Sequence, residues 1–207
     1  GDGWVCAASL ASHGTPVTVV TPVAPEEIDG ELPRTMAARA VRAGVRVRVS
    51  PDADALAGLL GDADVLVDAC FGTGFHGALP EPYATWVQVT DESFLGQVVS
   101  VDVPSGVSAS TGMAEGPYFM ADRTVTMFAA KPGLLSGVGR VASGEIVVAS
   151  LAARDGATDV EELAETVALE EGDYLDAFPA PDVMQDKYAR GRVLVVAGSR
   201  RYPGAAI

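Results

Sequence analysis

The chain has 207 residues, which is long enough for one complete domain and part of a second. Its apolar fraction of 48% provides for a packed core and indicates a globular rather than a disordered protein. Acidic residues outnumber basic ones by 28 to 14, and the formal net charge of −14 argues against nucleic acid or an anionic membrane as a partner, because both attract positive charge. An anionic small molecule held by backbone amides stays compatible with this charge.

The two cysteines, Cys6 and Cys70, are too few for a disulfide framework and lack the spacing of metal ligands. We interpret them as free buried thiols, which fits a protein of the reducing cytoplasm. No apolar run approaches the length of a signal peptide or a membrane span. The chain begins in a predicted loop and ends in mid-pattern at Ile207, so we expect it to be part of a longer protein.

Apolar, β-branched runs alternate with segments of helical periodicity along the first 150 residues. Helices are predicted at residues 4–12, 32–43, 53–60 and 82–92. Strands are predicted at residues 16–21, 45–49, 65–69, 98–103, 123–128 and 144–149. Glycine-rich loops are predicted at residues 1–3 and 71–77, and another loop at residues 131–141 separates the last two strands.

This alternation is typical of βα units on a parallel sheet. We therefore predict an α/β fold, a doubly wound, Rossmann-like three-layer αβα sandwich with a mostly parallel sheet and helices on both faces. The period-two pattern of residues 45–49 gives that strand one wet face and places it near the sheet edge. The strand at residues 65–69 is predicted to be buried.

The composition changes after Leu151. Acidic residues crowd the next segment, which also contains Pro179 and Pro181, and we interpret it as a solvated linker with a short helix. A buried strand and a glycine turn begin again at residues 192–199. The predicted organisation is a first domain at residues 1–151, a linker at 152–190 and the start of a second domain at 191–207.

Two carboxylates stand at equivalent places on two predicted strands. Asp68 lies at the end of one strand and Asp102 at the end of another, and each is followed by a glycine-bearing turn. A single carboxylate there is more often a turn former, but a buried strand end disfavours a charge that is not paired, hydrogen-bonded or bound to a cation. Ligands of an open parallel sheet bind at this edge. The two carboxylates together therefore predict a functional site.

Ser105, in Pro104-Ser105-Gly106, belongs either to this site or to a turn or helix cap. A hydrolase nucleophile would need the pattern Gly-x-Ser-x-Gly, but Val103 stands two residues before Ser105. His13, at a predicted helix end, and His76, in the second glycine loop, have no matching partners for a triad. The sequence therefore argues against a serine hydrolase.

The segments Gly1-Asp2-Gly3 and Gly72-Thr73-Gly74 allow the backbone to approach a ligand closely and offer amides to phosphates. Either segment alone is a weak signal, and their occurrence beside two strand-end carboxylates is a more specific one. Lys131 follows the strand at residues 123–128 and either reaches the same edge or is simply exposed.

These motifs resemble, in order and spacing, those of the NAD(P)H-hydrate epimerase (YjeF N-terminal) family. Residues 1–3 are similar to the end of that family's Gly-Asn-Asn-Gly-Gly-Asp-Gly loop. Its Val-Asp-Ala-x-Phe-Gly-Thr-Gly and Ser-Val-Asp-Ile-Pro-Ser-Gly motifs resemble residues 67–74 and 100–106. Thr111-Gly112, residues 121–126 and residues 131–134 match as well, so the resemblance covers residues 1–151 and is highly specific.

The resemblance implies a metabolite-repair enzyme that interconverts the (R) and (S) forms of hydrated NADH and NADPH (NADHX and NADPHX). It implies one potassium ion per site, held by Asp68, Ser105 and an asparagine of the first loop that this chain lacks. A homodimer is expected from the family, with neither nucleic acid nor a membrane as partner. The residues that the resemblance assigns to substrate binding are Asp2, Gly72, Thr73, Gly74, Phe75, His76, Gly77, Ala78, Tyr83 and Asp102.

Residues 187–199 and 202–205 resemble the opening of the ADP- or ATP-dependent NAD(P)H-hydrate dehydratase domain, which is similar to ribokinases. The resemblance implies a bifunctional parent protein that carries both activities. A first strand without the rest of its sheet does not form a nucleotide site, so we expect no dehydratase activity from this chain.

The hydrated carbon lies next to the ring nitrogen, and its inversion requires either loss of the hydroxyl or opening of the ring. Both routes need a proton that is given and taken back. We assign this role to Asp102, with Lys131 as an assistant, and we expect a cation at Asp68 and Ser105 to position the substrate and offset developing charge.

Two other classes of protein stay open. Some family members are non-catalytic scaffolds, in apolipoprotein binding or in messenger RNA decapping. The decapping-type scaffolds tend to lose the site carboxylates, whereas this chain has Asp2, Asp68, Asp102 and Ser105. The apolipoprotein-binding relative keeps the epimerase motifs, so a second, binding role stays open. A generic Rossmann-type oxidoreductase is the second, but a complete Gly-x-Gly-x-x-Gly loop and a suitably spaced acidic residue are not visible. The sequence therefore favours the epimerase.

Overall fold

The structure of the chain is a computed structural model that describes residues 1–149, with helices and parallel strands alternating along the chain. The α-helices are α1 (Asp2–Ser12), α2 (Glu31–Arg42), α3 (Ala53–Gly61), α4 (Tyr83–Ser93) and α5 (Gly137–Ala142). The strands are β1 (Thr18–Thr21), β2 (Arg46–Val49), β3 (Val65–Asp68), β4 (Gln97–Val101), β5 (Arg123–Met127) and β6 (Glu145–Ala149). Two 3-10 helices are η1 (Pro25–Glu27) and η2 (Pro132–Leu135). The predicted α/β class and all the predicted strands are confirmed.

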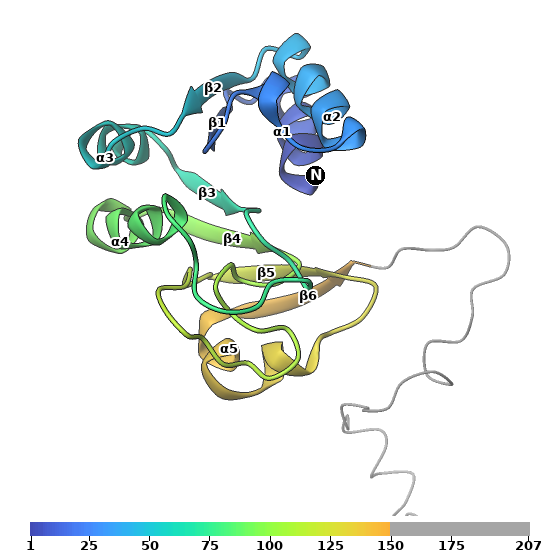
Figure 1. The fold of residues 1–207 in the computed structure, drawn as a ribbon, viewed down its shortest axis with the longest axis vertical. Helices are drawn as coiled ribbons and strands as arrows, with labels where there is room; N and C mark the ends of the chain where they lie inside the picture. Colours follow the sequence, from blue (N-terminus) through green and yellow to red (C-terminus); the bar gives the residue numbers. More distant parts are fainter. Residues whose placement is uncertain (150–207) are drawn as a thin grey trace, which may run out of the picture. The chain divides into compact units, whose positions relative to one another are not determined.

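The strands form two parallel sheets within residues 1–149, where the sequence predicted one (Figure 1). The first sheet pairs β1 with β2, and the second has the order β3-β4-β5-β6. β2 is an edge strand, as its alternating sequence predicted, and Arg46 and Arg48 on one of its faces are exposed.

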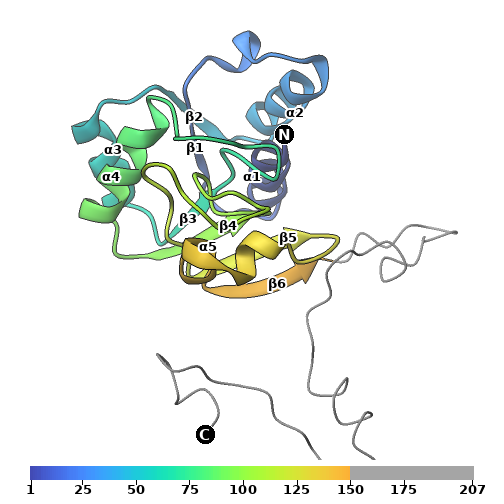
Figure 2. The same cartoon turned by 60° about the horizontal axis from the view of Figure 1, so that its bottom comes forward.

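Helices cover both faces of the first sheet. Val19 of β1 packs with α1 and α2, in a cluster that includes Trp4 and Ala37. The next residue, Val20, points to the opposite face because side chains alternate along a strand, and it packs with Trp86 of α4 and residues of α3. Figure 2 shows α1 and α2 on one side of these strands and α3 with α4 on the other. The predicted three-layer arrangement is therefore present here.

The second sheet buries one face more completely than the other. Asp68, Ser100 and Thr124 are partners in register on neighbouring strands, so they share a face, and all three are buried. On the opposite face of β3, Val65 is 50% and Val67 is 37% exposed. The prediction of a buried strand was therefore wrong for this face: Leu66 on the other face packs into buried clusters, whereas Val65 and Val67 belong to none of the buried hydrophobic clusters of residues 1–149.

Two loop predictions were also wrong. Helix α1 begins at Asp2 rather than after a loop at residues 1–3, and an acidic residue in the first turn suits the helix dipole. Residues 131–141 contain η2 and most of α5. These short, glycine-rich helices have weak intrinsic propensity and form because Leu134 and Ala142 pack into one buried cluster with Val103.

The other organisational predictions have different outcomes. Cys6 and Cys70 are both free and half-buried. Among residues 1–149, no helix combines the length and the apolar character that a membrane span requires. The predicted linker at 152–190 and the second domain at 191–207 lie outside the described residues.

The buried cluster around Leu134 gives a stability prediction. Leu134 is completely buried, so Leu134→Ala should lower the free energy of unfolding by about 2 to 5 kcal/mol through lost burial and a residual cavity. Leu95 is fully exposed, so Leu95→Ala should stay within about 0.5 kcal/mol of the parent chain. Chemical denaturation monitored by circular dichroism measures both, and equal losses would contradict the assignment of this core.

Candidate active site

The carboxyl ends of β3, β4 and β5 bring the predicted polar residues together. Asp68 is the last residue of β3, Asp102 directly follows β4, and Lys131 follows β5 after a short turn. Because the three strands are parallel neighbours, their carboxyl ends lie at one edge of the sheet. At that edge, Lys131 Nζ lies 2.5 Å from Asp102 Oδ1.

The two carboxylate oxygens of Asp102 have different surroundings. Oδ1 accepts hydrogen bonds from Lys131 Nζ at 2.5 Å and from the Met127 N–H at 3.3 Å. Oδ2 accepts one from the Thr73 N–H at 3.4 Å and faces Gly72 of the glycine loop. Asp102 also has a φ of 70°, a left-handed conformation that few residues other than glycine adopt and that is often found at functional sites.

Burial by itself raises the pKa of the Asp102 carboxyl. This effect is outweighed by the hydrogen bond and the charge of Lys131 and by the hydrogen bonds from the Met127 and Thr73 N–H groups, which lower the pKa. The pKa of Asp102 therefore lies below its ordinary value, and the group is a carboxylate at neutral pH.

Lys131 uses all of its hydrogen-bonding capacity within the protein. Its ammonium donates to Asp102 Oδ1, to Thr126 Oγ1 at 2.9 Å and to the Met127 carbonyl at 2.7 Å. An ammonium has three N–H donors, and these three acceptors account for them. Lys131 is therefore placed to hold Asp102.

Asp68 has the opposite electrostatic environment. It is 2% exposed, its Oδ1 accepts from Ser105 Oγ at 2.6 Å, and its Oδ2 accepts from the Ser105 N–H at 2.7 Å and from Ser100 Oγ at 2.9 Å. Burial raises the pKa of Asp68, against the hydrogen bonds from Ser105, Ser100 and Cys70, which lower it. The ion pairs in residues 1–149 are Lys131–Asp102 and Arg123–Glu145, so no side-chain cation there balances Asp68.

Ser105 connects Asp68 to the glycine loop. Its hydroxyl donates to Asp68 and accepts from the Phe71 N–H at 2.9 Å. Carboxylate and hydroxyl oxygens are hard ligands that suit a cation such as potassium, and an unbalanced buried carboxylate is the charge that such a cation would neutralise. Asp68 and Ser105 therefore fit the implied metal in chemical type. Residues 1–149 contain no group of three or more His, Cys, Asp or Glu side chains that could hold a metal by themselves.

A cavity of about 680 Å³ opens beside Asp102. Seven of the predicted substrate-binding residues line it, together with two residues that sequence reasoning missed, Cys70 and Phe71. Their position between Asp68 and Gly72 was the signal that could have found them. The complete lining is Asp2, Cys70, Phe71, Gly72, Thr73, Gly74, Phe75, His76 and Asp102.

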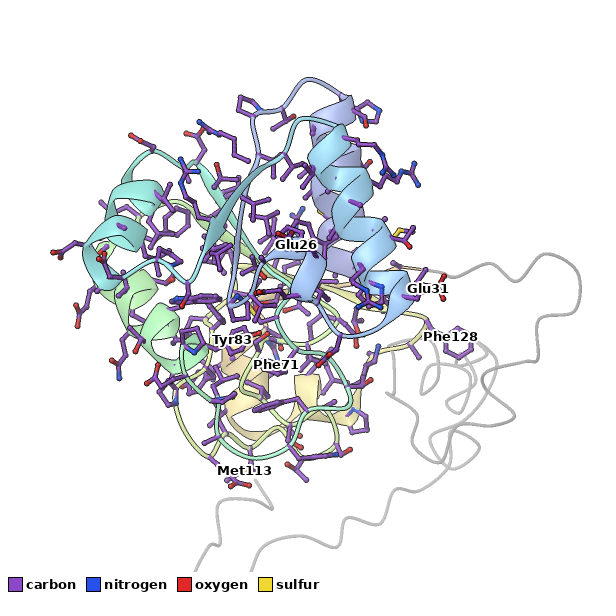
Figure 3. All side chains as sticks on the ribbon, turned by 45° about the horizontal axis from the view of Figure 1, so that its top comes forward. Glu26, Glu31, Phe71, Tyr83, Met113 and Phe128 are labelled. Carbon is purple, nitrogen blue, oxygen red and sulfur yellow. The ribbon has the colours of Figure 1, made fainter. Side chains whose placement is uncertain are left out.

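The remaining predicted residues lie near this cavity but do not line it. Gly77 and Ala78 follow farther along the loop, and Lys131 contacts the lining residue Asp102. Tyr83 begins α4, and its ring packs edge-on against Phe71 with a centroid separation of 4.7 Å; Figure 3 shows the two side chains next to each other. Tyr83 therefore contacts the lining residue Phe71 and does not itself line the cavity.

The thiol of Cys70 is a different case. Burial is the main cause that raises its pKa, and the charge of Asp68 adds to it. The thiol is therefore protonated at neutral pH and does not serve as a thiolate nucleophile.

The chain is similar over its whole length to curated repair enzymes. It is 38% identical to the bifunctional NAD(P)H-hydrate repair enzyme Nnr of Hyperthermus butylicus, over 100% of this chain and 36% of the relative. It is 36% identical to the enzyme of the same name from Thermofilum pendens, over 100% of this chain and 38% of the relative. The bifunctional NAD(P)H-hydrate repair enzyme of Leishmania major is 31% identical, over 100% and 37% respectively. The chain thus spans little more than a third of the length of these relatives.

A solved structure with a similar fold is the crystal structure of yeast ynu0, YNL200c. The TM-score is 0.56 at 26% sequence identity, and the match covers 64% of this chain and 54% of the yeast chain. The family described as YjeF-related protein N-terminus matches residues 1–133, a range that contains Asp68, Asp102, Ser105 and Lys131. From this match over most of its length, the chain belongs to the family of YjeF-related protein N-termini.

Proposed function

We propose that this chain forms the epimerase site of an NAD(P)H-hydrate repair enzyme. The reaction interconverts the (R) and (S) forms of NADHX and NADPHX, so that an (S)-specific dehydratase restores NADH and NADPH. The observation that carries the proposal is Asp102, whose Oδ1 is held by Lys131 while its Oδ2 faces the glycine loop. The relatives are named NAD(P)H-hydrate repair enzymes, which supports this substrate class.

The cavity suits one part of such a substrate. Its volume of about 680 Å³ lies in the range of small-molecule sites, and the backbone of the glycine loop offers close approach and N–H groups. Phe71 and Phe75 supply apolar lining, and Asp102 supplies the charge. We assign the hydrated nicotinamide ring to the position beside Asp102 Oδ2.

Because its pKa is lowered, Asp102 is ionised at neutral pH and can begin the reaction as a proton acceptor. Asp102 Oδ2 takes the proton of the substrate hydroxyl, a C=O bond forms, and the C–N bond breaks with its electron pair on the ring nitrogen. The conjugated carboxamide of the substrate delocalises this pair. After rotation, the nitrogen attacks the other face of the carbonyl carbon, and Oδ2 returns the proton to the oxygen, so atoms and charge balance.

Lys131 has a more limited role in this mechanism than that of a second proton-transfer group. Its three N–H donors are all engaged by protein acceptors, and it does not line the cavity. We assign Lys131 to positioning Asp102 and to keeping it ionised. This refines the expectation that Lys131 assists in catalysis.

Potassium is part of the proposal. Asp68 and Ser105 would hold the ion, which when bound supplies a fixed positive charge near the glycine loop. The loop N–H of Phe71 bonds to Ser105, so the same residues that would hold the ion also fix the loop. An asparagine of the family's first loop would complete the ligand set.

Other parts of the proposal concern the whole protein. The ADP- or ATP-dependent dehydratase is assigned to the domain that starts at residue 191, outside the described residues. A homodimer and a cytoplasmic location stay predictions. The retained pair of Asp102 and Lys131 favours the enzyme over a non-catalytic binding module of the same fold.

The central prediction concerns Asp102. In the complete gene product, Asp102→Asn should lower the enzyme-dependent rate of epimerisation by about 10²- to 10⁴-fold, because the base is lost. The rate is measured by supplying the (R)-hydrate with an (S)-specific dehydratase and following NADH formation. Asp91→Asn, at an exposed position of α4, is the control and should keep the parent rate. An undiminished rate for Asp102→Asn would remove Asp102 from the mechanism.

A second prediction concerns the pKa of Asp102. Lys131→Met should raise it, since burial then acts with less opposition, and ¹³C NMR titration of the side-chain carboxyl measures the change. In the parent chain the pKa of Asp102 is lower in the folded state than in the unfolded state. Ionised Asp102 therefore stabilises the folded chain at pH values above the ordinary carboxyl pKa. This stabilisation is lost as the pH falls through the pKa of the folded state. In Lys131→Met, the free energy of unfolding should no longer show this decrease at acidic pH. Arg123→Met, which breaks the exposed pair with Glu145, should leave the Asp102 titration unchanged.

A third prediction concerns the cation. The complete gene product should have a higher Tm in potassium chloride than in tetramethylammonium chloride at equal ionic strength, because a ligand that binds the folded state stabilises it. Ser105→Ala should abolish the difference between the salts, whereas Ser93→Ala, at an exposed position, should preserve it. Identical Tm values of the parent protein in both salts would rule out a stabilising potassium site.

A further inference from the structure

Thr126 is a buried residue of β5 whose hydroxyl contacts both members of the Asp102–Lys131 pair. The residue is fully buried. Its Oγ1 accepts a hydrogen bond from Lys131 Nζ at 2.9 Å and lies 3.5 Å from Asp102 Oδ1. The backbone of the next residue, Met127, contacts the same two groups through its N–H and its carbonyl. Thr126 and Met127, at the end of β5, thus both contact the ion pair.

Of these contacts at the end of β5, the one made by the Thr126 hydroxyl can be removed by a substitution. The Met127 contacts come from the backbone, so they persist whatever side chain is present. Among residues 1–149, the hydroxyl of Thr126 is the one side-chain acceptor for Lys131 besides Asp102. The Lys131 side chain is only 18% exposed, so a lost acceptor would not be freely replaced by water, and an N–H would be left without a partner.

The turn after β5 brings Lys131 back to this place. Phe128 has a φ of 69°, in the left-handed region, and its side chain projects outward (Figure 3). The Ala129 N–H then donates to the Met127 carbonyl at 2.8 Å, which closes the turn. The Lys131 side chain consequently crosses the end of β5, where it meets Thr126.

We propose that Thr126 is a positioning residue of the epimerase: its hydroxyl fixes the Lys131 ammonium on Oδ1 of Asp102 and thereby leaves Oδ2 facing the cavity. This inference rests on the proposed role of Asp102 as the proton-transfer group. The hydroxyl acts through Lys131 and Asp102, and Thr126 does not line the cavity.

Several charged and titratable groups lie around Asp102, and the test must separate the effect of Lys131 on the pKa of Asp102 from that of the others. Lys131 faces Asp102 directly from the turn after β5. The titratable residues that line the cavity together with Asp102 are Asp2 of α1, Cys70 directly before the glycine loop, and His76 in that loop. A change at Thr126 leaves these last three in place, so a shifted titration of Asp102 reports on its contact with Lys131.

The test compares three substitutions on one strand. Thr126→Val keeps the shape of the side chain and removes the hydroxyl, whereas Thr126→Ser keeps the hydroxyl. Thr124→Val is the matched control, because Thr124 is equally buried on the same face of β5 but its hydroxyl donates to the Ser143 carbonyl at 2.8 Å. Thr124→Val thus removes a buried hydrogen bond of β5 that does not touch the ion pair.

In the complete gene product, Thr126→Val should lower kcat for epimerisation by about tenfold or more with little change in KM, as expected for a lost hydrogen bond to a charged group. The acidic limb of its pH–rate profile should move to higher pH. Thr126→Ser should restore both the rate and the profile. Thr124→Val should lower the Tm and leave the pH profile in place.

NMR of the folded chain keeps this inference separate from the proposed function. Thr126→Val should raise the pKa of the Asp102 carboxyl in a ¹³C titration and change the ¹⁵Nζ signal of Lys131, with or without activity. If the parent protein does not epimerise the hydrate but this titration shifts, the proposed function fails and the positioning contact stands. If the titration and the pH profile of Thr126→Val match those of Thr124→Val, the inference is wrong. Should Thr126→Val not fold, the contrast between Thr126→Ala and Thr126→Ser tests the hydroxyl alone.

Discussion

The ion pair between Asp102 and Lys131 is the interaction on which the site depends. The two residues are 29 positions apart in the chain, and they meet because β4 and β5 are parallel neighbours whose carboxyl ends share one edge. The left-handed backbone of Asp102 and the turn at Phe128 aim the two side chains at each other. The pair gives the two Asp102 oxygens different partners: Oδ1 accepts from the ammonium and the Met127 N–H, and Oδ2 accepts from the Thr73 N–H beside Gly72. The proposed proton transfer uses this asymmetry.

Asp68 and Asp102 occupy equivalent strand ends but have opposite electrostatics. Burial dominates at Asp68 and raises its pKa, whereas the nearby ammonium and N–H donors lower the pKa of Asp102. Sites that need different tasks from like groups commonly separate them in this way. The separation supports the division of roles in which Asp68 serves a cation and the glycine loop, and Asp102 serves the substrate.

The sheet supports this site from one face. Ser100 on β4, which is in register with Asp68 on β3, donates to the Asp68 carboxylate, and Thr126 on β5 contacts the Asp102–Lys131 pair. These small hydroxyl side chains occupy positions where a buried face would ordinarily carry aliphatic residues. The buried face of the second sheet therefore combines packing with the polar contacts that hold the two carboxylates.

The sequence by itself determined the α/β class, the six strands and the placing of Asp68, Asp102 and the loop from Gly72 at one sheet edge, because periodicity and glycine positions are local signals. It could not determine that β3 is exposed on one face, that residues 131–141 are helical or that α1 begins at Asp2, since these depend on packing with distant residues. The role of Lys131 was likewise open between exposure and the site. Only the tertiary structure decided where its ammonium lies, because the three acceptors come from Thr126 and Met127 on β5 and from Asp102 directly after β4.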